Sequence, residues 1–328
     1  MRQAKLFFLL VLSILILYTI TGFYFLPLAS YEGDLTRIGK LPEIQFGWTK
    51  PQPAIAPALL QQSSWSEADV LVIGDSYSKP HLWQSVLVSH GLKVHTEDWI
   101  NVQAVCADFQ SWLSSLKFKG KYVILENAER GVEGNLNKSL ECKNMRYRNY
   151  AYPQLAPPDT LPDRARTDYS GQLSVGIMTR LHMLEYEYLG SKPAFKTWQV
   201  SKEVRLERLA NGCELFSHPR CRDVLFFNED RMNDFDDSMY KKMSTLETRL
   251  PGLVVIWAVV PDKSTAYLNP NKLFWQQAKE HFLAPDLLST FREAIQDKTV
   301  DLYRANDTHL STLGFLIMGQ ELSRFIDK

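Results

Sequence analysis

Two short segments far apart in the chain carry the residue types that a serine nucleophile requires. The first is Gly-Asp-Ser-Tyr-Ser at 74–78, which follows an apolar run and precedes a helix-like stretch. Ser76 is therefore expected where a strand turns into a helix, with its hydroxyl at the carboxyl edge of a sheet. The second segment is Asp-Thr-His at 307–309. Because a histidine oriented by a carboxylate can activate a serine, acyl transfer through Ser76, His309 and Asp307 is the leading hypothesis.

Each of these residues also has a purely structural interpretation. Small residues are common in strand-to-helix turns, and Ser78 can simply cap a helix. A lone histidine such as His309 is more often structural or exposed than catalytic. Asp307 or Ser311 can be the N-cap of the last helix. The position of Ser76 at a sheet edge, together with the distant Asp/His pair, favours the catalytic interpretation.

An oxyanion would need hydrogen-bond donors that point at it. The candidates are the backbone N–H of Ser76 or Tyr77 and the side chain of Asn127, which follows the third predicted strand. Asn101 is a weaker candidate because it can cap the helix that follows it. For Arg130 two interpretations stay open, which are binding of substrate or oxyanion and a structural salt bridge.

The hydrophobic pattern of the globular part alternates between strand-like and helix-like segments. A β-α-β-α-β order predicts a parallel sheet with helices on both faces, and ligands bind beyond the carboxyl ends of such strands. Strands are expected at 69–73, 92–96, 121–126, 253–260 and 299–302. A helix with Pro80 in its first turn and Gly91 just after its end is expected to follow the first strand. The other expected helices include 102–116, 236–249, 271–282, 286–297 and a final amphipathic helix at 311–326.

The middle of the chain interrupts this alternation. Residues 138–167 are rich in proline and have no clear periodicity, so an irregular insertion or lid is expected there. A helix follows at 171–188, and then a hairpin-rich stretch with strands at 194–206 and 223–227. We therefore expect an insertion at about 138–222 within a catalytic domain of residues 67–328.

The first 31 residues predict a membrane anchor. Arg2 and Lys5 precede an uncharged run from 6 to 31, which is long enough to cross a bilayer as a helix. The positive flank predicts a cytoplasmic N-terminus and an exported chain, in a single-pass protein of the inner (cytoplasmic) membrane with its catalytic domain in the periplasm. An uncleaved anchor is favoured over a cleaved signal peptide because the run is long and the cleavage pattern is poor. Residues 32–66, with four prolines, are interpreted as an extended linker.

Composition and cysteine content narrow the function classes. The 37 basic and 37 acidic residues give zero net charge, so nothing favours nucleic acid as a partner. The four cysteines allow three pairings, and no Cys-x-x-Cys spacing indicates zinc. Cys213 and Cys221 can close a small loop, whereas Cys106 lies in a helical pattern and can be a core residue. We expect no cofactor and no metal.

Taken together, these residues resemble the SGNH (GDSL-like) hydrolase superfamily. Gly-Asp-Ser follows the first strand, Asn127 follows the third, and an Asp/His pair lies near the C-terminus. Three further stretches look like the alginate O-acetyltransferase-type branch, whose members accompany a membrane-bound O-acyltransferase. They are 123–130, 215–218 with 223–227, and 260–267. The wider superfamily places its aspartate three residues before the histidine, where this chain has Asn306; the Asp-x-His arrangement belongs to the alginate-type branch.

The resemblance implies a flavodoxin-like three-layer sandwich with a central parallel sheet and a serine–histidine–aspartate triad. It implies Ser76 as nucleophile, His309 as base and Asp307 as orienting acid, with Lys263 and Tyr267 in a supporting or substrate-contacting role. The expected function is an extracytoplasmic O-acetyltransferase that passes acetyl groups from a membrane-bound O-acyltransferase to a polysaccharide acceptor. A carbohydrate acetyl esterase with the same triad and a non-catalytic assembly or glycan-binding subunit are the alternatives.

Overall fold

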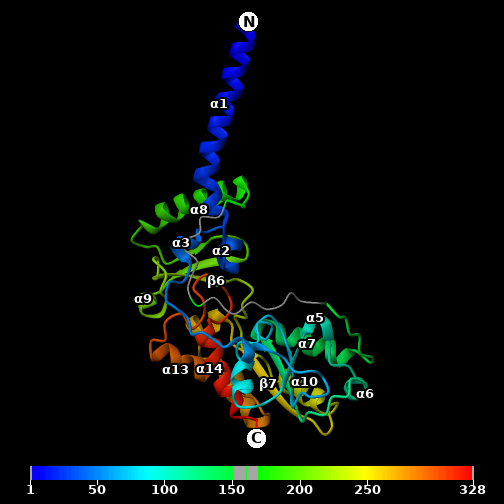
Figure 1. Cartoon of the computed structure of the whole chain (residues 1–328). Helices are drawn as coiled ribbons and strands as arrows, with labels where there is room; N and C mark the ends of the chain where they lie inside the picture. Colours follow the sequence, from blue (N-terminus) through cyan, green and yellow to red (C-terminus); the bar gives the residue numbers. More distant parts are fainter. Residues whose placement is uncertain (1, 151–159, 161–168, 327–328) are drawn as a thin grey trace. The chain divides into compact units, whose positions relative to one another are not determined.

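The computed structural model, which describes residues 2–150, 160 and 169–326, contains a parallel four-stranded sheet in the order β2-β1-β3-β7 (Figure 1). The strands are β1 (Val70–Gly74), β2 (Val94–Asp98), β3 (Tyr122–Ala128) and β7 (Val254–Val260). Every residue of β1 and β3 is buried. Buried parallel strands have continuous apolar sequences, which explains why the sequence predicted β1, β3 and β7. The more polar β2 was expected two residues earlier, at 92–96.

This sheet belongs to the larger of two compact units, which comprises Pro51–Thr160, Glu229–Tyr303 and His309–Lys328 and is called the sheet unit below. Gly91, at φ +86°, follows the first helix after β1 as expected from its position. The helices of the sheet unit are η2 (Pro57–Leu60), α4 (Gln84–Ser89), α5 (Trp99–Val102), α6 (Phe109–Ser115), α7 (Glu129–Glu141), α10 (Ser238–Glu247), α11 (Lys263–Leu268), α12 (Phe274–His281), α13 (Leu287–Gln296) and α14 (Thr312–Ser323).

Two predictions about the sheet unit were wrong. The strand expected at 299–302 is an irregular turn, because Lys298 and Asp301 have left-handed φ angles of 57° and 56° that no extended strand accepts. Only an isolated bridge joins Tyr303 to Leu310 in this region. The helix expected at 102–116 is divided into α5 and α6, because Gln103 has a positive φ of 62° and ends the first of them.

The second unit, called the anchor unit below, comprises Met1–Lys50, Leu161–Asn228 and Arg304–Thr308. Its antiparallel sheet has the order β4-β5-β6, which confirms the hairpin expected in this part of the chain. Side chains from α2, α8 and these strands form a separate apolar core. The elements are α1 (Arg2–Phe25), η1 (Leu26–Ala29), α2 (Asp34–Gly39), α3 (Glu43–Phe46), α8 (Leu173–Gly190), β4 (Thr197–Gln199), β5 (Val204–Arg208), α9 (Gly212–Leu215) and β6 (Asp223–Phe227).

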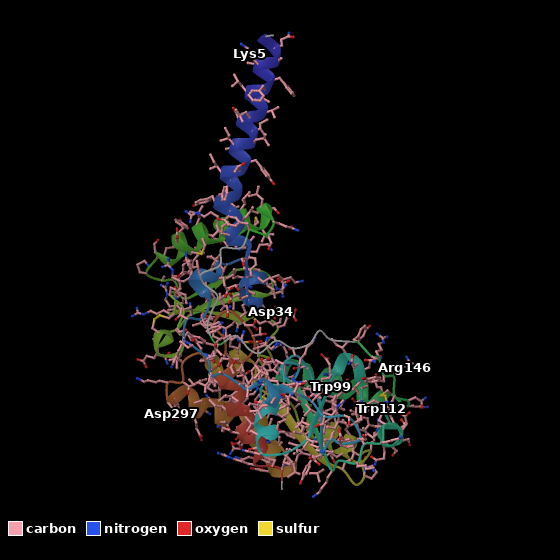
Figure 2. The ribbon with its side chains drawn as sticks, viewed as in Figure 1. Lys5, Asp34, Trp99, Trp112, Arg146 and Asp297 are labelled. Atoms are coloured by element: carbon pink, nitrogen blue, oxygen red, sulfur yellow. A yellow bond between two sulfur atoms is a disulfide. The ribbon has the colours of Figure 1, made fainter. Side chains whose placement is uncertain are left out.

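The predicted N-terminal apolar helix is confirmed as α1. The span Gln3–Ala29 is long and apolar enough to cross a membrane, and almost none of it is buried. Figure 2 shows the side chains of its N-terminal part, around Lys5, pointing away from the helix with no protein packed around them. An isolated helix with an apolar surface on all sides is stable in lipid rather than in water.

The segment predicted as an extended linker, 32–66, has folded parts. Its first half forms α2 and α3, and Leu35, Leu41 and Phe46 are fully buried in the core of the anchor unit. Apolar residues of this proline-containing segment therefore pack against strands that are distant in sequence. Composition alone does not predict such contacts. Most of the lid expected at 138–167 lies outside the described residues.

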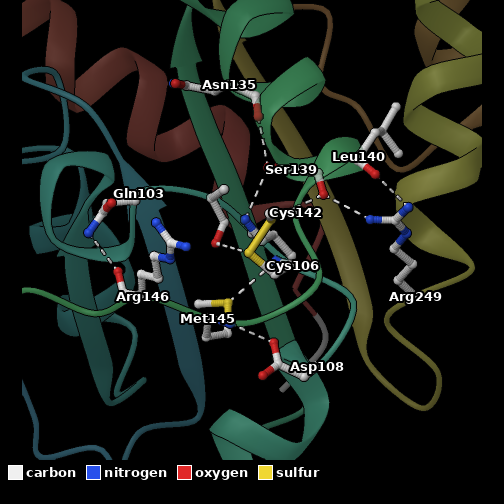
Figure 3. Close-up of a disulfide and its surroundings, with 12 residues drawn as sticks. Gln103, Cys106, Asp108, Asn135, Ser139, Leu140, Cys142, Met145, Arg146 and Arg249 are labelled. Atoms are coloured by element: carbon white, nitrogen blue, oxygen red, sulfur yellow. Dashed lines mark hydrogen bonds between the residues drawn. A yellow bond between two sulfur atoms is a disulfide. The ribbon is translucent and has the colours of Figure 1, made fainter.

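All four cysteines form disulfides. Cys213–Cys221 closes the small loop that their spacing allowed. Cys106 is buried, as expected of a core residue, but it lies in the loop before α6 rather than in a helix and pairs with Cys142 just after α7 (Figure 3). At the same end of α7, Arg249 donates hydrogen bonds of 2.8 Å to the backbone carbonyls of Ser139 and Leu140, which satisfies groups that a helix end leaves open.

Removal of the Cys106–Cys142 disulfide should destabilise the protein strongly. The bond spans 36 residues, so the chain-entropy relation gives a loss of about 4 kcal/mol in unfolding free energy for Cys106→Ala/Cys142→Ala. The matched pair Cys213→Ala/Cys221→Ala spans 8 residues and should lose about 2.5 kcal/mol. Urea unfolding followed by tryptophan fluorescence measures both. An unchanged midpoint in the first variant would contradict this disulfide.

Candidate active site

The turn after β1 presents Ser76 at the carboxyl end of a central strand. Gly74 ends the strand and must be glycine, because a Cβ there would collide with Ser78 Oγ and Glu126 Oε2. The backbone N–H groups of Ser78 and Lys79 both donate to the Asp75 carbonyl, which tightens the turn. Ser76 is exposed, whereas its neighbours Tyr77 and Ser78 are fully buried.

His309 meets Ser76 within the sheet unit. Its Nε2 lies 2.7 Å from Ser76 Oγ, in the range that a nucleophile and its general base need. The Tyr77 ring packs against the imidazole at a centroid distance of 4.9 Å. His309 lies directly before the Leu310 bridge and the start of α14, so two fixed elements limit its position.

Ser311 is the N-cap of α14, since its hydroxyl accepts a hydrogen bond of 3.1 Å from Gly314 N–H. That confirms one of the two structural alternatives and removes the cap role from Asp307. The Asp307 carboxylate, in the anchor unit, accepts a hydrogen bond of 3.2 Å from Asp34 N–H. Because His309 belongs to the sheet unit, the role of Asp307 as its orienting acid stays a prediction.

Asn306 occupies the position where the wider superfamily has its aspartate. Its amide Nδ2 donates to the Glu43 carboxylate inside the anchor unit. Burial raises the pKa of Glu43, although hydrogen bonds from Thr36 and others oppose that shift. Asn306 is therefore part of the packing around α2 and α3.

A pair of carboxylates that the sequence interpretation missed holds the Ser76 turn. Glu126 is completely buried and accepts hydrogen bonds from Asp75 N–H at 3.0 Å and from Ser78 Oγ at 2.6 Å. Asp75 in return accepts from Tyr77 N–H at 2.9 Å and from Ala128 N–H at 2.7 Å. The two acidic side chains thus tie the end of β1 to the end of β3. The one available signal was an acidic residue that closes the apolar run of β3.

Burial is the main reason that the pKa of Glu126 is raised well above its usual value, and the neighbouring Asp75 raises it further. Hydrogen bonds from Ser78 and from the Asp75 backbone act in the opposite direction. The protonated form of Glu126 is therefore favoured more strongly than that of an exposed glutamate.

The predicted oxyanion donors differ in what they contact. The Tyr77 N–H, which was one candidate, donates to Asp75 Oδ1, so the expectation for this group was wrong. Asn127 is buried, and its Oδ1 accepts a hydrogen bond of 2.7 Å from Asn135 Nδ2. That bond orients the carboxamide and makes its Nδ2 the group that can serve an oxyanion. The Ser76 N–H is the second candidate.

Arg130 forms a structural ion pair, one of the two interpretations left open for it. Its Nη1 lies 2.5 Å from Asp262 Oδ1 and 3.6 Å from Asp230 Oδ1. Burial, and then the nearby Asp230, raise the pKa of Asp262 to about 7 against the opposing effect of Arg130. The guanidinium keeps some exposure, at 22% of its side chain. Substrate binding by Arg130 is therefore compatible with the pair and stays a prediction.

Lys263 and Tyr267, predicted in a supporting or substrate-contacting role, both belong to α11. Lys263 is buried, and the hydroxyl of Tyr267 is also buried although part of that residue reaches the surface. Burial raises the pKa of Tyr267. These positions favour the supporting role, because a buried amine does not reach a polymeric substrate.

In comparisons with known proteins, the chain matches no family model, no curated protein and no solved structure. What the site can do chemically therefore has to be judged from its geometry. An exposed serine hydroxyl within hydrogen-bond distance of an imidazole, at the carboxyl edge of a parallel sheet, is competent for nucleophilic catalysis.

Glu126→Gln should change how stability depends on pH. Because the pKa of Glu126 is raised on folding, its contribution to stability is complete below the unfolded pKa and is lost as pH rises through the folded pKa. Glutamine keeps an acceptor and a donor but does not titrate. Unfolding free energies measured from pH 5 to about 9 should therefore fall relative to Glu126→Gln as pH rises. If the difference in unfolding free energy between the wild type and Glu126→Gln stayed constant with pH, it would contradict the raised pKa of Glu126.

The second variant, Glu126→Ala, tests the hydrogen bonds themselves. It leaves the Asp75 N–H and the Ser78 hydroxyl buried without their acceptor, so we expect a loss of about 2 to 4 kcal/mol in unfolding free energy. Glu141→Ala, at the end of α7, is an exposed matched control that should change little.

Proposed function

We propose that this chain is an extracytoplasmic O-acetyltransferase with an SGNH-like catalytic domain. It transfers acetyl groups through an acyl-serine at Ser76 to hydroxyl groups of an exopolysaccharide or cell-envelope glycan. The observation that carries the proposal is the 2.7 Å contact between Ser76 Oγ and His309 Nε2 at the carboxyl edge of the parallel sheet. Ligands bind at this edge in open parallel sheets.

The sheet order supports the finer fold assignment within this proposal. The order β2-β1-β3-β7 corresponds to the first four positions of a flavodoxin-like sheet, 2-1-3-4. The fifth position is not a strand, because the backbone N–H of Trp257 in β7 donates instead to the Leu283 carbonyl. We infer a three-layer sandwich of SGNH type with a shortened sheet.

The chemistry follows from the two reacting side chains. Ser76 Oγ attacks the carbonyl carbon of the acetyl donor while His309 Nε2 takes the hydroxyl proton. The negative charge on the carbonyl oxygen is stabilised by the Ser76 N–H and Asn127 Nδ2. When the donor's leaving group departs, it takes the proton from His309. The acceptor hydroxyl then repeats these steps in reverse on the acyl-serine, which releases the acetylated glycan and restores the Ser76 hydroxyl.

The cellular location is supported by α1 and by the disulfides. A positive N-terminal flank before a helix of membrane-spanning length predicts a cytoplasmic N-terminus and an exported remainder. Two disulfides that use all four cysteines fit an oxidising compartment. Acetyl-CoA is a cytoplasmic donor, so a membrane-bound O-acyltransferase must supply the acetyl group from the membrane.

Ser76→Ala should abolish acetyl transfer while leaving the protein folded. The reason is that the Ser76 hydroxyl, 2.7 Å from His309 Nε2, is the nucleophile of the proposed reaction, and alanine has no hydroxyl to form the acyl-serine. Hydrolysis of a chromogenic acetyl ester by the full chain should fall by roughly 10³-fold or more. Ser115→Ala, an exposed serine in α6, is the matched control and should retain the wild-type rate. Retention of activity by Ser76→Ala would remove Ser76 from the mechanism and favour a non-catalytic subunit.

The same assay with an oligosaccharide acceptor separates transfer from hydrolysis. A transferase should yield acetylated oligosaccharide at the expense of free acetate. Hydrolysis that is unaffected by the acceptor would identify an esterase instead.

Asp307→Asn tests the third member of the predicted triad. If Asp307 orients His309, this variant should lower kcat by roughly 10⁴-fold with little change in KM, because the imidazole would hold the wrong tautomer. Asp297→Asn, which changes an exposed aspartate just after α13, serves as the matched control. Equal kcat values in the two variants would assign Asp307 to the packing of the anchor unit alone.

A further inference from the structure

We propose that α8 lies in the outer interface of the membrane that α1 enters, with one face inserted into the boundary between headgroups and acyl chains. This inference rests on the membrane anchoring in the proposed function. It adds a second membrane contact, made by a segment that follows α1 by about 150 residues of sequence.

The first observation is an exposed apolar stripe on α8. Ile177, Leu181, Leu184 and Tyr188 follow one another at helical spacing and are 36%, 51%, 46% and 66% exposed. Residues at these intervals share one face of a helix. Solvent exposure of such a continuous stripe is unfavourable in water, and larger exposed apolar patches mark interaction surfaces.

The opposite face of α8 packs against the core of the anchor unit. Met183 and Tyr186 are buried in the core of the anchor unit, and Thr179 is fully buried beside them on the same face. The helix is therefore apolar on two sides, of which the protein covers one. The charged residues Glu185 and Glu187 are exposed and lie to the sides of the stripe. An apolar stripe with polar flanks is the pattern of a helix that lies in a membrane interface.

The second observation is the position of α8 against the end of α1. A Cβ at Gly176 would collide with the Phe25 carbonyl oxygen, and the Phe23 ring packs edge-on against Tyr169 at 5.5 Å. The Tyr31 hydroxyl, beyond η1, is hydrogen-bonded to Thr179 Oγ1. Figure 1 shows α8 lying across the end of α1 within this unit.

The length of α1 fixes the depth of that contact. From Leu6, the first residue after Lys5, to Phe25, the helix rises about 30 Å at roughly 1.5 Å per residue. This equals the thickness of a bilayer's hydrocarbon core, about 30 Å. Phe25 and the α8 backbone that touches it therefore fall at the outer boundary of the hydrocarbon.

The residues at the far end of the stripe fit the same environment. Tyr188 carries a ring with a polar hydroxyl, a residue type enriched at membrane interfaces. The Lys192 ammonium lies over that ring, 4.3 Å from its centroid, where it can meet lipid phosphates. Lipid is therefore the occupant that the stripe, its flanks and its depth favour together.

Site-specific fluorescence quenching in vesicles tests this inference. All four native cysteines are paired, so a single introduced cysteine is the only thiol to label. Full-length Leu181→Cys and Leu184→Cys carry the label on the stripe, Leu15→Cys carries it in the middle of α1, and Lys202→Cys carries it on an exposed loop between β4 and β5. Vesicles of phosphatidylethanolamine and phosphatidylglycerol contain lipids spin-labelled either near the headgroup or deep in the acyl chain.

The expected result is stronger quenching of the stripe labels by the shallow spin label than by the deep one. The label at position 15 should show the reverse ratio, and the label at position 202 should show no quenching. Quenching at 15 with none at 181 and 184 would overturn the inference while the anchor stands. No quenching at 15 would overturn the anchor and this inference together, whereas the Ser76→Ala assay would be unaffected. The same measurement can be made in vesicles that also contain a membrane-bound O-acyltransferase. Stripe labels whose fluorescence changes only when that protein is present would assign the stripe to a protein partner and also overturn the inference.

Discussion

The Ser76 turn depends on two carboxylates, the partly buried Asp75 and the fully buried Glu126, which accept backbone N–H groups from the ends of β1 and β3. Burial and the nearby Asp75 raise the pKa of Glu126, which favours its protonated form, and the two side chains support the turn together as one hydrogen-bonded unit. That unit ties the end of β1 to the end of β3. Because it holds the turn through Asp75 and Ser78, the hydroxyl of Ser76 takes no part in the support and remains directed at His309.

The carboxyl ends of β3 and β7 hold a second set of buried charges. Arg130 lies between Asp230 and Asp262, and Lys272 is paired with Glu129, whose other oxygen accepts the Asp262 N–H at 3.0 Å. Buried ions are retained only when their partners and hydrogen bonds offset the desolvation penalty. The result is a set of fixed charges at the edge of the sheet where the proposed reaction would occur, and fixed charges stabilise developing charge without reorganising.

Helix α8 of the anchor unit has apolar residues on two faces, of which one is packed in the protein and the other is exposed. Met183 and Tyr186 of α8 pack into a core with residues from α2 and the antiparallel sheet, as in a protein in water. Ile177 and Leu184, on the other side of the helix, have no core to enter. The consequence is an exposed apolar face on α8, in the same unit as the membrane-length apolar helix α1.

Much of the fold could be predicted from local sequence. The apolar runs of β1, β3 and β7 predicted their strands because both faces of these strands are buried, and the glycine at 91 marked the end of α4. The strand expected at 299–302 failed for the opposite reason. Lys298 and Asp301 have left-handed backbone conformations, which interrupt a strand and which their residue types do not predict. The disulfide partner of Cys106 could not be predicted from the sequence either, since spacing alone does not select one of the three possible pairings of four cysteines.

The sequence by itself determined that a serine follows a buried strand, that a histidine follows an aspartate near the C-terminus, and that a long apolar helix begins the chain. These are properties of residue type and short spacing. Tertiary structure alone decided that Ser76 and His309, 233 residues apart, come within 2.7 Å, that Glu126 supports the turn, and that Tyr77 N–H is already bonded to Asp75. Each of these depends on where β1, β3 and the start of α14 meet. The physical reason is that a hydrogen bond requires a particular distance and direction between two groups, and residue spacing along the chain does not specify either of them.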